Sequence, residues 1–257
     1  MKSDSPLTNQ CLATRASREG LRARILALPP GDVPLHGVEA LRERFEAEQG
    51  AARASDRGDV RGTLAASVGA YARSGREAIA LAQQRAVFSA LRRAGVRVLC
   101  MKGANLALRV YDSPSLRVRA DLDILCRPEE REIVRAVLLG LGYRPVPAPS
   151  RRYASYQETF VPPAHGLDVD VHWQVSNRRA LASAFDWPSV WARREPLGPA
   201  VPDGFGLSLR DEFVLGNAHR HVHDAAPYRW HGRVVKGTER LLWQWDLHLV
   251  YDALGAT

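Results

Sequence analysis

Two aspartates in a β-prone run have a spacing that suits metal binding. Asp121 and Asp123 are separated by Leu122, and Ile124 follows. Successive side chains of a strand point to opposite faces, so a strand here places both carboxylates on one face and the two apolar residues on the other. Carboxylate oxygens are ligands that Mg²⁺ prefers. An Asp-x-Asp pair is expected about once by chance, so only its context gives it meaning.

A second acidic strand is predicted further along the chain. Residues 167–172 alternate strictly between apolar and polar types, which places Asp168, Asp170 and His172 on one face. A polar strand face lines either a surface or a site. Either aspartate could therefore supply a third carboxylate to the first pair.

Lysine is rare in this chain, with only Lys2, Lys102 and Lys236 among 36 basic residues. Lys102 precedes Gly103, and a compact ammonium group beside a glycine suits contact with a phosphate or carboxylate. Chance retention of a lysine is the alternative.

Two arginines precede the Asp-x-Asp pair. Arg117 and Arg119 could contact a triphosphate or an RNA backbone through paired N–H groups. The alternative is that they are solvated loop residues.

The apolar spacing predicts alternating helices and strands. Gly75 is expected to break the long helix predicted over 62–94. The buried face of this helix is expected to comprise Leu64, Val68, Tyr71, Ile79, Leu81, Val87 and Leu91. Strands are predicted over 96–101, 121–126, 153–161 and 167–175, and helices over 38–49, 62–94, 104–111, 128–142, 181–191, 210–224 and 239–254.

These elements predict four segments. Residues 1–34 form a polar, mobile N-terminal arm, and 35–94 form N-terminal helices. Residues 95–177 form the core that carries the aspartates, and 178–257 form a helical C-terminal lobe.

Composition narrows the class of protein. The 257 residues are 46% hydrophobic and 25% charged, which is typical of a globular protein, and no apolar run approaches the ~20 residues of a membrane helix. We expect a cytoplasmic protein with reduced thiols at Cys11, Cys100 and Cys126, because their spacing suits neither a metal site nor a disulfide framework. The net charge of +8 suits a polyanionic partner.

A histidine cluster offers a weaker metal hypothesis. His219 and His223 share a helix face at i, i+4 and could bind one zinc ion, but His221 points elsewhere and no second ligand pair is evident. A structural or substrate-facing role is favoured.

Several motifs together resemble one family. They are Met101-Lys102-Gly103, Arg117 four residues before Asp121-Leu122-Asp123, Gly142-Tyr143, and Val169-Asp170-Val171-His172-Trp173. Their order and spacing over about residues 60–250 resemble the uncharacterised nucleotidyltransferase family of the polymerase-β superfamily. One departure is that Ala104 follows Gly103, where superfamily members commonly have a second glycine or a serine.

The resemblance implies an α+β fold, a polymerase-β-like nucleotidyltransferase core with a mixed sheet flanked by helices, and added N-terminal and C-terminal helices. It implies transfer of a nucleoside monophosphate from an NTP with two Mg²⁺ ions. Asp121 and Asp123 would bind the nucleotide-associated ion, and Asp123 with Asp170 the ion that activates the acceptor hydroxyl. Asp170 matches the family pattern better than Asp168 does.

Further roles follow from the same resemblance. Lys102, Gly103, Arg117 and Arg119 would contact the nucleotide and its phosphates. A possible acceptor pocket comprises His172, His219 and His223, although a role for His172 in orienting Asp170 is favoured.

The acceptor stays open. It would be a small metabolite or a peptide natural product, with no membrane partner; the alternatives are a toxin that modifies tRNA and a catalytically silent protein that binds a nucleotide or a partner protein. The sequence does not fix the oligomeric state.

Overall fold

A computed structural model describes residues 17–54, 60–147, 156–224, 228–230, 233–235 and 240–255. Lys2, Cys11 and Lys236 lie outside these ranges. The chain divides into two compact units: one comprises Met1–Ala70 and Gly216–Thr257, and the other Tyr71–Leu215. Each unit is considered by itself below.

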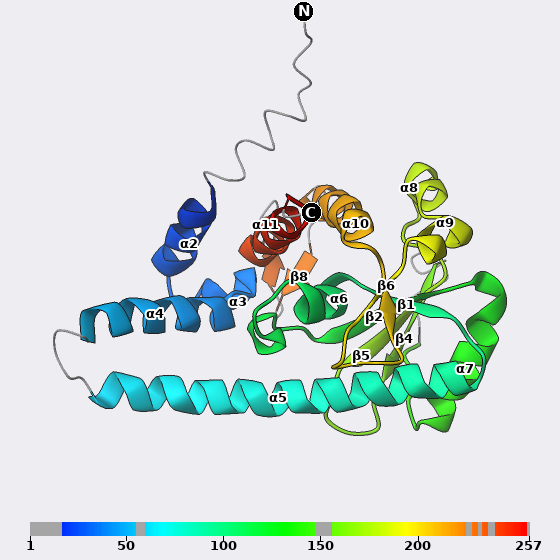
Figure 1. Ribbon diagram of the computed structural model, residues 1–257, viewed down its shortest axis with the longest axis horizontal. Helices are drawn as coiled ribbons and strands as arrows, with labels where there is room; N and C mark the ends of the chain where they lie inside the picture. The colour runs from blue at the N-terminus through cyan, green and yellow to red at the C-terminus, as the bar shows by residue number, and fades with distance from the viewer. Residues whose placement is uncertain are drawn as a thin grey trace, which may run out of the picture. The chain divides into compact units, whose positions relative to one another are not determined.

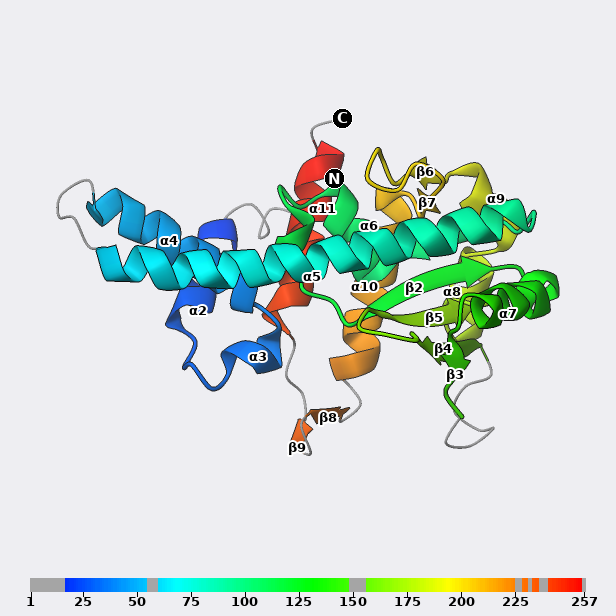
Figure 2. The same cartoon turned by 90° about the horizontal axis from the view of Figure 1, so that it is seen from below.

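The unit Tyr71–Leu215 is built on a mixed sheet with strand order β3-β4-β5-β2-β1-β7-β6. Strands β2 and β5 are parallel, β1 is antiparallel to β2, and β4 is antiparallel to β5. Figure 2 shows β2, β5, β4 and β3 side by side with helix α7 (Arg131–Gly140) next to them. The strands are β1 (Val98–Met101), β2 (Asp121–Cys126), β3 (Arg144–Pro145), β4 (Gln157–Val161), β5 (Asp168–His172), β6 (Glu195–Pro196) and β7 (Phe205–Gly206).

Helices connect these strands. The long helix α5 (Val60–Arg93) enters this unit, and α10 (Leu209–Asp224) leaves it (Figure 1). The helices between them are α6 (Lys102–Arg109), α7 (Arg131–Gly140), α8 (Arg179–Ala184) and α9 (Trp187–Ala192), with 3-10 turns at Pro114–Leu116 and Pro128–Glu130.

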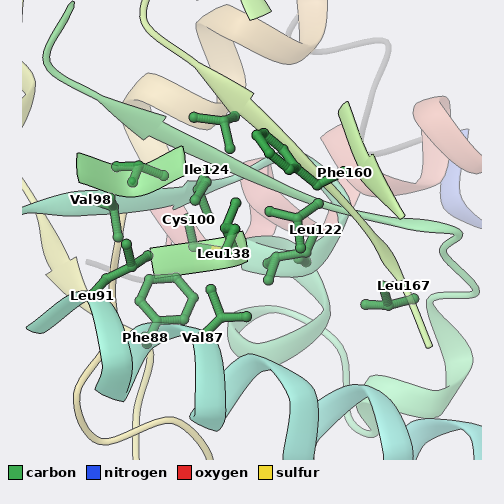
Figure 3. Close-up of a cluster of buried hydrophobic side chains, with 14 of the residues drawn as sticks. Val87, Phe88, Leu91, Val98, Cys100, Leu122, Ile124, Leu138, Phe160 and Leu167 are labelled. Carbon is green, nitrogen blue, oxygen red and sulfur yellow. The ribbon is translucent and has the colours of Figure 1, made fainter. Parts of the chain in front are cut away.

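One face of the sheet forms the main hydrophobic core. Leu122 and Ile124, which are on the opposite face to the aspartates, are fully buried. They belong to one cluster with Val87 and Leu91 of α5 and Leu138 of α7 (Figure 3). The alternation of β2 therefore places its apolar residues in the core and its acidic residues on the other face.

The second face of the sheet changes from apolar to acidic along the strands. Leu99 and Met101 of β1 and Leu125 of β2 pack in a second buried cluster with residues of α8 and α9. Further along the same face of β2 lie Asp123 and then Asp121. The polar site is thus an extension of a packed apolar surface.

Helix α5 differs from the sequence prediction in two ways. It passes through Gly75 without a break, since one glycine costs a helix only about 1 kcal/mol. Tyr71 and Ile79, which were expected in the buried stripe, are 79% and 47% exposed. Val87 and Leu91 are buried as predicted, and the side chains of Leu64 and Val68 lie outside the description.

The other unit is mainly helical. Leu21 and Ile25 of α2 are buried, and Phe45 of α4 meets Trp245 of α11 edge-to-face with ring centroids 5.3 Å apart. Its complete elements are α2 (Ser17–Ala27), α3 (Val33–His36), α4 (Glu39–Ala54), β8 (Tyr228–Trp230), β9 (Arg233–Val235) and α11 (Leu241–Gly255).

The predicted fold class, α+β with a mixed sheet flanked by helices, is confirmed. The segment 178–257 is not purely helical, because β6 and β7 join the main sheet and β8 pairs with β9. The four predicted segments stay a prediction. Within the described residues, no helix is long and apolar enough to cross a membrane.

Candidate active site

The pairing register of β2 and β5 brings the predicted carboxylates together. Asp123 is the register partner of Asp170, and Asp121 is the partner of Asp168. Register partners in neighbouring strands project to the same side of the sheet. The two acidic strands identified in the sequence therefore form one polar surface.

Ligand atoms converge most closely at three residues. Asp123, Asp170 and His172 each offer one atom, and these atoms all lie within 4.8 Å of one another. Asp121 is not a member of this group, although its predicted partners are. Its role in holding metal stays a prediction.

His172 contacts a different aspartate from the one that the sequence predicts. It was expected to orient Asp170, but its Nε2 lies 2.8 Å from Oδ1 of Asp123. Burial lowers the pKa of His172 and so favours the neutral ring; because an ionised carboxylate can only accept, Nε2–H donates to Asp123. His172 thus positions Asp123.

Asp170 is held by a residue that sequence reasoning missed. The hydroxyl of Thr159 on β4 donates to Oδ1 of Asp170 over 2.6 Å, and the two residues are register partners. Thr159 lies within a predicted strand, but only the pairing register reveals its contact with Asp170.

Lys102 lies in the acidic group. Its Nζ is 2.6 Å from Oδ1 of Asp123, the same oxygen that His172 contacts. Burial alone would lower the pKa of Lys102, but the negative charge of Asp123 outweighs it and raises that pKa. Lys102 is also the only non-glycine residue with positive φ (58°) in the described chain, a conformation that costs of order 1 kcal/mol.

A buried carboxyl group braces the backbone at Lys102. Oε1 of Glu212, at the start of α10, accepts hydrogen bonds from the Lys102 backbone N–H over 2.7 Å and from Nδ2 of Asn105 over 2.8 Å. Helix α6 has no side-chain cap of its own, so Glu212 supplies the acceptor for its first N–H. No sequence motif marked Glu212 or Asn105.

The acidic residues divide into two electrostatic classes. Burial raises the pKa of Asp121 to about 6, and the neighbouring charges of Asp123 and Asp170 add to this. Burial would also raise the pKa of Asp123, but Lys102 and His172 outweigh it and hold that pKa well below the ordinary value. Asp123 is therefore stabilised in its ionised form by its neighbours, whereas the ionised form of Asp121 is destabilised by them.

Arg117 lies against the Lys102–Gly103 turn. A Cβ atom at position 103 would lie 3.1 Å from a guanidinium nitrogen of Arg117, so a side chain there would require the guanidinium to move by a few tenths of an ångström. The side chain is largely buried and donates to the carbonyl of Val118 over 2.7 Å. The structure therefore brings Lys102, Gly103 and Arg117 together, and their contact with a nucleotide stays a prediction.

Arg119 takes part in a buried ion pair. Its two terminal nitrogens lie 2.9 and 2.8 Å from the two carboxylate oxygens of Glu77 on α5. Only 3% of the Arg119 side chain is exposed, so it is not a solvated loop residue. Its guanidinium is directed to Glu77, and phosphate contact by Arg119 stays a prediction.

The histidine pair of α10 lies in the other unit. His219 meets Trp243 edge-to-face, with ring centroids 5.0 Å apart, and the side chain of His223 lies outside the description. Roles for His219 and His223 in the acceptor pocket stay predictions.

The Glu212 carboxyl should make stability depend on pH. Burial raises its pKa from 4.5 to about 8. The contribution of Glu212 to the free energy of unfolding is therefore complete below pH 4.5. It falls by up to about 1.4 kcal/mol per pH unit as the pH rises from 4.5 towards 8, because the unfolded chain releases this proton more readily than the folded protein does. We expect Glu212→Gln to remove this loss. In urea titrations, the free energy of unfolding of the variant should therefore rise relative to that of the wild type between pH 6 and 8. The exposed Glu132→Gln serves as the control; equal slopes in all three proteins would contradict the prediction.

The donor set fits a hard divalent cation. Asp123 and Asp170 supply carboxylate oxygens at one place. A divalent ion would relieve the repulsion between the carboxylates, which adds to the effect of burial on the pKa of Asp121. His172 suits Mg²⁺ less well as a ligand, in keeping with its hydrogen bond to Asp123.

A family described as an uncharacterised nucleotidyltransferase matches residues 56–257. No curated protein matches. Among solved structures, the chain is similar to the solution structure of the antibiotic-resistance factor ANT(2'')-Ia, with 13% identity and a TM-score of 0.45, over 70% of this chain and 85% of that chain.

Proposed function

Because this chain belongs to the family of uncharacterised nucleotidyltransferases, we propose that it transfers a nucleoside monophosphate from an NTP to a hydroxyl of a small metabolite or a peptide natural product. The observation that carries the proposal is the register of β2 and β5, which sets Asp123 beside Asp170. Carboxylates on paired strands are held in one geometry, as charge stabilisation requires.

The proposed reaction is a displacement at phosphorus. The acceptor oxygen forms a bond to the α-phosphorus, the bond from that phosphorus to the bridging oxygen of pyrophosphate breaks, and the hydroxyl proton passes to a base. Asp170 is the proposed base. Its hydrogen bond from Thr159 leaves the carboxylate fixed in orientation.

Asp121, Asp123 and Asp170 would hold the Mg²⁺ ions. When bound, two such ions neutralise charge on the attacking and leaving oxygens. The chain's own contribution is to keep Asp123 ionised, through Lys102 and His172, and to place Asp170 next to it.

Lys102 and Arg117 are the proposed phosphate contacts. The Lys102 ammonium already lies among the carboxylates, where it balances the charge of Asp123. Arg117 packs on Gly103 directly beside it. This proximity supports the proposal that the two cations share a triphosphate, a role that suits the point charge of lysine and the forked guanidinium of arginine.

Removal of metal tests the proposal. We expect calorimetry to detect binding of a non-hydrolysable NTP with Mg²⁺ and a loss of at least tenfold in affinity when EDTA is added. Pyrophosphate release should show the same dependence. Binding without pyrophosphate release, across all four NTPs and varied acceptors, would favour the catalytically silent alternative.

The net charge of +8 and the pI near 9.8 keep a tRNA acceptor as the second candidate. Nucleic-acid binding releases counterions, so affinity for RNA falls steeply as salt rises, whereas affinity for a small acceptor changes little. A steep salt dependence of acceptor binding would favour the tRNA-modifying toxin.

A further inference from the structure

A cavity of about 530 Å³ opens beside the carboxylates, within the unit Tyr71–Leu215. It is lined by α5, by the loop that leads into β2 and by the loop that leads into β5. Ala120 and Asp168 form its border with the acidic strands, and Asp168 N–H donates to the Ala120 carbonyl over 3.1 Å. Asp168 precedes Asp170 by two residues, which is about 7 Å along a strand.

The lining is rich in cations. Arg73, Arg76, Arg117 and Arg119 contribute to it, against the two carboxylates of Glu77 and Asp168. Glu77 and Arg119 neutralise each other in their bidentate pair and form a fixed part of the wall. The other cations of the lining are Arg73, Arg76 and Arg117, against the single carboxylate of Asp168.

Two of these arginines are neighbours on one helix. Arg73 and Arg76 are three residues apart on α5, a spacing that puts their side chains on the same face. Burial lowers the pKa of Arg73, and the charge of Arg76 lowers it further. Like charges held this close stabilise a bound anion, because the anion relieves their repulsion.

Arg117 links the cavity to the carboxylate site. It lines the cavity, it packs on Gly103 beside Lys102, and its charge acts on Asp121. A molecule in the cavity would thus lie next to the place where a triphosphate meets Lys102. A volume of this size suits a small organic substrate.

We propose that this arginine-lined cavity binds the acceptor through an anionic group, a carboxylate or a phosphate, and so presents the acceptor hydroxyl to Asp170. This inference rests on the proposed function for the identity of the second substrate. It narrows the acceptor from any hydroxylated molecule to one that also carries a negatively charged group. The NTP triphosphate is the other source of the same chemistry, and the experiment separates the two.

The test uses the full chain and inorganic phosphate as the probe, without Mg²⁺ or NTP. The double variant Arg73→Gln/Arg76→Gln removes two cavity cations. The matched control Arg92→Gln/Arg93→Gln removes the same charge from the exposed end of α5, away from the cavity lining. Calorimetry at constant ionic strength should show at least tenfold weaker phosphate binding for the cavity variant and less than twofold change for the control.

A second measurement identifies the source of the anion. With Mg²⁺ present, the affinity of the cavity variant for a non-hydrolysable NTP should stay within twofold of the wild type. If the cavity variant loses affinity for the NTP as much as for phosphate, the assignment of the cavity to the acceptor is wrong. If the cavity variant binds phosphate as the wild type does, the cavity is not an anion site. Phosphate binding is measured without Mg²⁺ or NTP, so the cavity remains testable even if no NTP binds and the proposed function fails.

Discussion

Asp123→Asn is expected to lower the rate of nucleotide transfer by roughly 10³-fold, a loss typical of removing a group that stabilises transition-state charge. Asparagine keeps the shape of the side chain but not its charge, and the charge of Asp123 is what Lys102 and His172 are arranged around. Initial rates of pyrophosphate release at saturating Mg²⁺ measure this effect.

Asp170 and Asp168 provide the matched comparison. Both lie on the same face of β5, but only Asp170 belongs to the group of converging ligand atoms. Asp170→Asn should therefore resemble Asp123→Asn, whereas Asp168→Asn should lose no more than about tenfold. The reverse result would make Asp168 the third carboxylate. Circular dichroism and thermal unfolding of each variant show whether a lost rate reflects a lost fold.

Glu77→Met is expected to lower the free energy of unfolding by about 3 kcal/mol, which is the usual effect of removing one partner of a buried ion pair. The methionine leaves the guanidinium of Arg119 in place, with 3% of its side chain exposed and no opposing carboxylate. Urea titrations monitored by tryptophan fluorescence measure the loss.

The double variant Glu77→Met/Arg119→Met separates charge from packing. Replacing both members with apolar residues removes the unpaired charge, and most of the lost stability should return. The exposed Glu132→Gln controls for loss of a surface carboxylate and should change stability by less than about 0.5 kcal/mol. A loss below about 1 kcal/mol in Glu77→Met would show that Arg119 finds another partner or solvent.

The acidic strands were predictable because strand alternation is a local property. The pattern of residues 167–172 specified that Asp168, Asp170 and His172 share a face, and β5 confirms it. The pairing of Asp123 with Asp170 was not derivable from spacing, because a segment of more than 40 residues separates the two strands and register depends on tertiary packing.

The supporting groups were hidden for the same reason. Glu212 reaches Lys102 from 110 positions away, and Glu77 reaches Arg119 from 42. Neither glutamate differs in its local sequence from a solvated helix residue. The exposed Tyr71 and Ile79 show the converse error, since helical spacing marks a face as apolar without marking where the sheet that covers it ends.

The parallel register of β2 and β5 ties the acidic residues to the hydrophobic core through alternate positions of the same two strands. Leu122 and Val169 are packed in the core, while Asp123 and Asp170 lie next to them on the opposite face. The carboxylates therefore cannot separate by a loop movement. A shift of one residue in the register of β5 against β2 would place a valine, in place of Asp170, opposite Asp123. The amide hydrogens of these strands should exchange with solvent only in the opening that also disperses the carboxylates, so that this acidic surface and the fold are lost in a single cooperative step.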